Sequence, residues 1–263
     1  MKEIELALVQ MNSVICDAAR NFSEMKRHVL ANPDSDIVCF PEMCLSGYTT
    51  NDPERTALSP DDPIIDQIKN LSKETDTALV FGYLERSGGR PYMRQEIIDG
   101  DGRWFYRKSH LGRRESEVFE AGNELPVFDI RGIRVGIQLC IESHTQEICS
   151  TYRSKGAELV LTPFANGITG ERRKAVWNTY MPSRASDNGM YVAACSAIGD
   201  NGEGNVFGGG LLVLDPKGYP TYEYYGADDH SVTVKIGGNL PRDGPETMSN
   251  ISYFDRRRPE LYK

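Results

Sequence analysis

Residues 131–147 read RGIRVGIQLCIESHTQE, and this stretch joins a strand pattern to a candidate nucleophile. Its first half alternates apolar residues with smaller or polar ones, which is the period-2 pattern of a strand with one buried face: Ile133, Val135, Ile137 and Leu139. The pattern ends at Cys140, and we expect Ser143 to begin a helix that carries Glu147 near its positive end. Cys140 is therefore predicted to lie at a turn from a strand into a helix.

A cysteine at such a turn has two interpretations. Main-chain N–H groups and a helix N-terminus favour the thiolate, which is the nucleophilic form of the side chain. The alternative is a small, inert core residue, because free cysteines are often buried. This stretch alone leaves both open.

Composition limits the classes of function. With 263 residues and 39% hydrophobic composition, the chain can bury a large core, and without repeats or long linkers we expect one domain over residues 1–263. A formal net charge of −8 argues against nucleic acid or an anionic membrane as a partner. No apolar run approaches the ~20 residues that span a bilayer.

The cysteines predict a compartment. Six of them are scattered along a chain whose first residues, Met1-Lys2-Glu3, lead directly into a strand pattern. We therefore expect no signal peptide, free thiols and a cytoplasmic protein. The sequence has no cysteine or histidine pattern at zinc spacing, so we expect no metal site.

The remaining pattern indicates an α/β fold. About a dozen short strands alternate with helices expected over residues 17–31, 63–75, 143–155 and 171–187. Mixed βα units and hairpins indicate helices packed outside two sheets that lie face to face. The glycine-rich residues 199–210 are read as a hairpin, because the lysine of a phosphate-binding loop is missing.

Two charged residues occupy informative positions. Glu42 follows the buried strand pattern at residues 36–40, where α/β folds collect catalytic groups, although a solvated loop carboxylate fits equally well. Lys108 follows a hairpin at residues 94–106, and its position alone does not single it out.

Several motifs together resemble the nitrilase superfamily of carbon–nitrogen hydrolases. They cover essentially the whole chain in the expected order: Pro41-Glu42-Met43, Arg107-Lys108-Ser109-His110-Leu111, Glu115 with Phe119 and Gly122, Gly136-Ile137-Gln138-Leu139-Cys140, Arg184-Ala185-x-Asp187-Asn188 and residues 257–262. The resemblance implies an α-β-β-α sandwich of two mixed sheets flanked by helices. It also implies a homodimer or larger homo-oligomer and catalysis without a metal or organic cofactor.

The resemblance also implies residue roles. Glu42 is expected to be the general base, Cys140 the nucleophile, Lys108 the cation at the oxyanion, and Glu115 a supporting carboxylate. Substrate binding is expected from the backbone N–H of Ile141 and from three side chains: Tyr48, Phe164 and Asn166. These roles agree with the chemistry, because amide hydrolysis needs a nucleophile, a proton acceptor and a stabilised oxyanion.

The motif after the nucleophile leaves the substrate open. Glu142 stands where most amidases of the family carry Asp, and a Glu at this position is typical of nitrilases. However, Ile141 replaces the aromatic residue that nitrilases usually have between the Cys and this Glu. The short C-terminal region is typical of the family's small amidases. We expect hydrolysis of a small carboxamide or carbamoyl compound through a cysteine thioester. The alternatives are a nitrilase, a non-catalytic assembly module, and acyl transfer to an amine.

Assembly is predicted through the helices at residues 143–155 and 171–187. They carry large side chains that could form an interface, or that could pack within the chain instead: Tyr152, Val176, Trp177 and Tyr180.

Overall fold

The computed structural model describes residues 1–238 and 253–261, and its strands form two six-stranded sheets and one two-stranded ribbon. Tyr262, part of the last family motif, lies outside the described residues. The first sheet has the order β14-β1-β2-β3-β4-β5. Its strands are β1 (Ile4–Gln10), β2 (Ile37–Cys39), β3 (Ala78–Glu85), β4 (Tyr92–Asp99), β5 (Gly102–Arg107) and β14 (His230–Ile236).

The second sheet has the order β13-β12-β9-β8-β7-β6. Its strands are β6 (Val127–Ile130), β7 (Ile133–Ile137), β8 (Leu159–Phe164), β9 (Tyr191–Ser196), β12 (Leu211–Leu214) and β13 (Pro220–Tyr224). The glycine-rich segment forms the ribbon of β10 (Ile198–Asp200) and β11 (Val206–Gly208), as the hairpin interpretation predicted.

Both sheets are mixed and share one pattern of strand directions. In the first, β1, β2 and β3 are parallel and the outer pairs are antiparallel. In the second, β7, β8 and β9 are parallel and the outer pairs are antiparallel. The central parallel strands end in the loops that carry Glu42 and Cys140, where side chains from different strands can meet.

The main core lies between the sheets. Alternate residues of β1, β2 and β3 pack against alternate residues of β7, β8 and β9, and all of them are buried, as in Leu8, Cys39, Val135, Leu161 and Cys195. A strand that alternates in this way directs its other face outward, where it needs a second cover.

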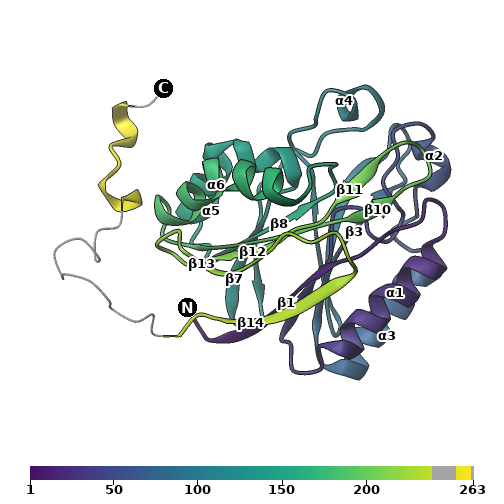
Figure 1. Ribbon diagram of the computed structural model, residues 1–263, viewed down its shortest axis with the longest axis horizontal. Helices are drawn as coiled ribbons and strands as arrows, with labels where there is room; N and C mark the ends of the chain where they lie inside the picture. The colour runs from purple at the N-terminus through teal and green to yellow at the C-terminus, as the bar shows by residue number, and fades with distance from the viewer. Residues whose placement is uncertain (239–252, 262–263) are drawn as a thin grey trace.

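Helices provide that cover. On the first sheet lie α1 (Ala18–Ala31) and α3 (Pro63–Thr75), and on the second lie α5 (Gln146–Ser154) and α6 (Gly170–Ser186). Figure 1 shows the two pairs of helices on opposite sides of the sheets. The predicted α-β-β-α sandwich is therefore confirmed. Every helix in the described part of the chain is too short or too polar to cross a bilayer.

The shorter elements connect these layers. They are α2 (Pro53–Thr56), α4 (Glu115–Val118) and three 3₁₀ turns, at Cys140–His144, Phe254–Arg256 and Pro259–Leu261.

Local signals located most helices well. Asp17 accepts a hydrogen bond from the Arg20 N–H at the start of α1, and Pro63 begins α3 behind an Asp62 cap. In the last turn of α1, the apolar side chain Leu30 is 56% exposed and His28 is buried.

The helix after Cys140 begins later than predicted. Cys140–His144 forms a 3₁₀ turn, and α5 begins at Gln146 rather than at Ser143. The reason is a bond that the pattern does not reveal: the Ser143 hydroxyl donates to the Cys140 carbonyl at 2.6 Å, which stabilises a separate tight turn.

Three of the four candidate interface residues are core residues instead. Tyr152 and Trp177 are fully buried within the chain and Tyr180 is nearly so, between the second sheet and its helices. The Tyr152 hydroxyl also donates to the Ile137 carbonyl. These three side chains are therefore unavailable to a partner, and only Val176 is partly exposed.

Candidate active site

Three loops bring the predicted catalytic residues together. Glu42 follows β2, Lys108 follows β5, and Cys140 follows β7. The backbone fixes the Lys108 position firmly, since its N–H donates to the Met93 carbonyl at 2.9 Å and its carbonyl accepts from the Gly122 N–H at 2.8 Å. Gly122 has to be glycine at this approach, because a Cβ there would lie 2.2 Å from the Arg107 carbonyl oxygen.

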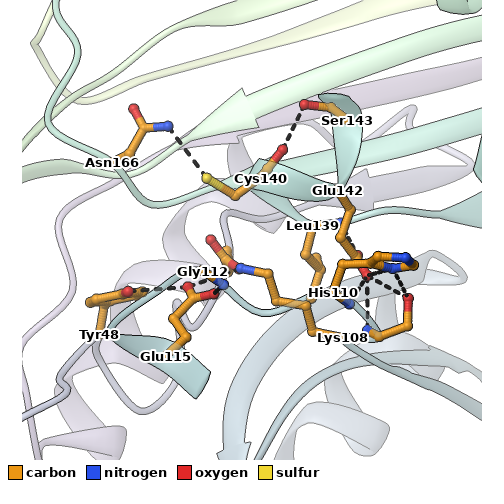
Figure 2. Close-up of polar contacts among 12 residues, drawn as sticks. Tyr48, Lys108, His110, Gly112, Glu115, Leu139, Cys140, Glu142, Ser143 and Asn166 are labelled. Atoms are coloured by element: carbon orange, nitrogen blue, oxygen red, sulfur yellow. Dashed lines mark hydrogen bonds and ion pairs between the residues drawn. The ribbon is translucent and has the colours of Figure 1, made fainter. Parts of the chain in front are cut away.

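Lys108 is the centre of a buried charge network. Its Nζ donates to Glu42 Oε1 at 2.8 Å and to Glu115 Oε1 at 2.9 Å. The Glu115 carboxylate also accepts from the Tyr48 hydroxyl at 3.1 Å and from the Gly112 N–H at 2.6 Å (Figure 2). The second Glu42 oxygen, Oε2, is buried and has no hydrogen-bond partner. Such an orphan acceptor is able to take a proton.

This network shifts the pKa values of its members. Burial raises the pKa of Glu42 to about 7, and the nearby charge of Lys108 limits that rise. Burial alone would lower the pKa of Lys108, but the Glu42 and Glu115 carboxylates outweigh it and raise that pKa well above its usual value. At neutral pH the lysine is therefore a permanent cation, while Glu42 exchanges a proton easily.

Cys140 occupies a strained position. Its φ is +46°, in the left-handed region that residues with a side chain avoid, and such strain is concentrated at functional sites. The Asn166 side-chain amide donates to the Cys140 sulfur at 3.3 Å. Figure 2 shows Asn166 approaching the sulfur from the side opposite Glu115. The Cys140 sulfur is thus held by its turn and by the loop after β8.

The expectation that the turn favours a thiolate was wrong. Burial raises the pKa of the Cys140 thiol to about 11, and the Glu42 charge adds to the rise, while Lys108 and the Asn166 hydrogen bond oppose it. Desolvation of an anion outweighs the turn dipoles here. The thiol is therefore the form of Cys140 present at neutral pH.

The predicted substrate-binding residues differ in how accessible they are. Ile141 is 43% exposed beside Cys140, whereas Phe164 is only 2% exposed and packs against Trp177 with ring centroids 5.0 Å apart. The Tyr48 ring packs edge-on against Phe207, and its hydroxyl is engaged by Glu115. Asn166 is partly exposed and contacts the Cys140 sulfur. Their roles toward a substrate stay predictions.

The sequence analysis missed Arg173. This arginine of α6 is fully buried and donates to three acceptors: the Gly209 carbonyl at 3.0 Å, the Asn166 carbonyl at 3.2 Å and the Ser196 hydroxyl at 3.1 Å. Its Nη1 is buried without a partner, and burial lowers its pKa to about 10. Among the described residues, the ion pairs do not include Arg173. A lone arginine on a helix pattern gives no signal of such a position.

Comparison with known proteins identifies the family of the chain. A model of the carbon–nitrogen hydrolase family matches residues 5–227. The chain belongs to the carbon–nitrogen hydrolase family. The resemblance that the motifs suggested is therefore confirmed, and the chain is an enzyme of this family.

Individual relatives carry different names. A hydrolase encoded in the pqqF 5′ region of Pseudomonas protegens is 30% identical over all of this chain and 92% of its own length. A nitrilase of Pyrococcus abyssi is 27% identical over 99% of this chain and 100% of its own. Among solved structures, an amidase of the nitrilase superfamily from Nesterenkonia superimposes with a TM-score of 0.83, at 22% identity, over 98% of this chain and 95% of its own.

Proposed function

We propose that this enzyme hydrolyses a small carboxamide or carbamoyl compound through a thioester on Cys140. The observation that carries this proposal is the Glu42 carboxylate, which is held through Oε1 by Lys108 and has a buried, unpartnered Oε2. Such a group, with a pKa of about 7, can accept and return a proton near neutral pH.

In the first half of the reaction, the Cys140 sulfur attacks the carbonyl carbon while its proton passes to Glu42. The carbonyl electron pair moves to oxygen, and the Lys108 cation and the Ile141 N–H stabilise the oxyanion. When the tetrahedral intermediate collapses, the carbon–nitrogen bond breaks and Glu42 returns the proton to the leaving nitrogen. Ammonia departs and the acyl group remains on sulfur.

In the second half, water attacks the thioester and gives its proton to Glu42. The oxyanion forms again in the same site, and its collapse expels the sulfur, which regains the proton from Glu42. The carboxylic acid is released. Glu115 keeps Lys108 in place throughout, since it binds the same ammonium group as Glu42.

Nitrile hydrolysis through a thioimidate is the second candidate, and Glu142 is the residue that favoured it. In the structure Glu142 is fully buried, and five hydrogen bonds from protein groups occupy its carboxylate. Glu142 therefore supports the framework of the site, and its presence does not indicate whether an amide or a nitrile bond is cut. A nitrile also cannot satisfy a site that hydrogen-bonds a carboxamide, which discriminates strongly against it.

Ammonia release from matched amides and nitriles of the same acyl group tests the proposal. We expect kcat/KM to be higher for the amide in each pair, with ureido acids included as carbamoyl compounds. If the nitrile reacts faster in every pair, the nitrilase proposal replaces the amidase proposal. Hydroxylamine added to the assay would reveal acyl transfer as hydroxamate, and absence of turnover together with an unlabelled Cys140 would favour an assembly module.

We also propose that the enzyme is a cytoplasmic, single-domain homodimer or larger homo-oligomer. The free cysteines support the compartment. With Tyr152 and Trp177 buried in the core, an interface over α5 and α6 would have to use their exposed polar residues and Val176. A monomeric mass in light scattering at micromolar concentration would contradict the assembly.

A further inference from the structure

We propose that Glu142 is the positioning residue that holds the Lys108 segment against the Cys140 turn. This inference rests on the proposed roles of Lys108 and Cys140. Glu142 itself belongs to the 3₁₀ turn of the nucleophile, yet most of its bonds lead to the other segment.

The two carboxylate oxygens of Glu142 accept hydrogen bonds from different segments. Its Oε1 accepts from the Tyr106 hydroxyl at 2.6 Å, the Ser109 hydroxyl at 2.7 Å, the Ser109 N–H at 2.8 Å and the His110 N–H at 3.0 Å. Its Oε2 accepts from the Leu139 N–H at 2.7 Å. Ser109 adjoins Lys108 in the chain, and Leu139 adjoins Cys140. One side chain therefore sets the distance between the proposed cation and the proposed nucleophile.

The arrangement requires a carboxylate of this length. All five partners are donors, so the site suits a group that only accepts hydrogen bonds. A glutamine would direct its own N–H groups at some of these donors, and an aspartate, one methylene shorter, could not reach both segments. Figure 2 shows Glu142 and His110 on the side of Lys108 away from Glu115, so this contact is separate from the Glu42–Lys108–Glu115 network.

The charge of Glu142 also acts on the general base. Glu42 is faced by Lys108, Glu115, Cys140 and Glu142, and the Glu142 charge is one of those that raise the pKa of Glu42. Around Glu142 itself lie Tyr106, whose pKa burial and this carboxylate raise, and His110, whose Nδ1 is 3.8 Å away. Tyr152 is the other titratable neighbour, and its pKa rises through burial and the Glu142 charge. Loss of the charge should therefore lower the pKa of Glu42.

Three variants separate position from charge. Glu142→Gln removes the charge and some of the acceptors, Glu142→Asp keeps the charge but shortens the reach, and Tyr106→Phe removes one donor. The matched control is Glu96→Gln. Glu96 is equally buried and accepts from Arg94, Arg103 and Tyr83, but it takes no part in the site.

The measurements are kcat and KM as functions of pH, with Tm for each variant. In Glu142→Gln we expect kcat to fall by about 10²-fold with little change in KM, because displaced reacting groups cost about that much. The acid limb of kcat/KM should move to lower pH. Glu142→Asp and Tyr106→Phe should lose kcat with the acid limb unmoved, and Glu96→Gln should lose Tm but keep both kcat and the limb.

Parental kcat and an unmoved acid limb in a folded Glu142→Gln would overturn the inference. The inference would also be overturned if Glu142→Gln and Glu96→Gln lost kcat in the same proportion to their loss of Tm. If Glu142→Gln does not fold, the other two variants decide, because parental kcat in both would contradict a positioning role. Turnover by Cys140→Ala would instead mean that the proposed function has failed.

Discussion

Lys108 Nζ lies 2.8 Å from Glu42 Oε1, and the other Glu42 oxygen is buried without a partner. The lysine therefore orients the carboxylate without occupying it fully. One oxygen fixes the position of the group while the other is able to carry the proton. This division explains how a single carboxylate could act first as base and then as acid.

Cys140→Ala should abolish ammonia release while the protein stays folded, because the reaction has no other route to a thioester. The substitution removes only the sulfur atom of a partly buried side chain, so Tm should change only slightly. Cys149→Ala, which removes a buried thiol from α5, is the matched control and should keep most activity. Turnover by the Cys140 variant at the parental rate would refute the mechanism.

Lys108→Met should affect both stability and activity. It leaves two carboxylates buried without their cation, which costs about 3–5 kcal/mol of unfolding free energy. Loss of the oxyanion cation should also lower kcat by about 10²–10³-fold. The stability loss should be larger at pH 8 than at pH 5, because protonation relieves the buried carboxylates at low pH. Thermal denaturation at both pH values checks this.

The control for that experiment is Lys69→Met, which breaks a surface ion pair with Asp101. Exposed pairs contribute about 0–1 kcal/mol, so its Tm should barely change. An equal loss of Tm in the two variants would argue against a buried charge network.

The pH dependence of kcat/KM should report Glu42. The base acts in its ionised form and its pKa is about 7, so activity should rise with pH through that value. The thiol, with a pKa of about 11, stays protonated over the same range and contributes no second limb there. Glu117→Gln, at an exposed carboxylate of α4, should keep the profile. A midpoint near 4.5, the ordinary value of a glutamate, would contradict the raised pKa of Glu42.

Arg173→Met should weaken the support of the nucleophile. The variant removes the guanidinium donor to the Asn166 and Gly209 carbonyls, and Asn166 donates the hydrogen bond that lowers the pKa of Cys140. We expect kcat to fall and the pKa of Cys140 to rise, which the pH dependence of alkylation by iodoacetamide measures. Arg172→Met, at the exposed neighbouring residue, is the control. Alkylation curves that coincide for the two variants would contradict a role at the sulfur.

The sequence by itself determined the elements and the candidate residues. Period-2 and helical patterns, together with the Asp17 cap and the Pro63 start, located most strands and helices, because these signals act over a few neighbouring residues. The family motifs selected Glu42, Lys108 and Cys140 for the same reason: each has a recognisable local context. The roles of these residues stay proposals that the experiments above test.

Only the tertiary structure decided how these groups influence one another. Burial raises the pKa of the Cys140 thiol, which the turn alone would have lowered, because desolvation depends on everything packed around the sulfur. Glu142 and Arg173 connect residues that lie 33 and 36 positions apart, as in the bonds to Ser109 and Gly209, and no local pattern contains such partners. Tyr152 and Trp177 became core residues for the same physical reason, since a helix pattern does not say which sheet will cover it.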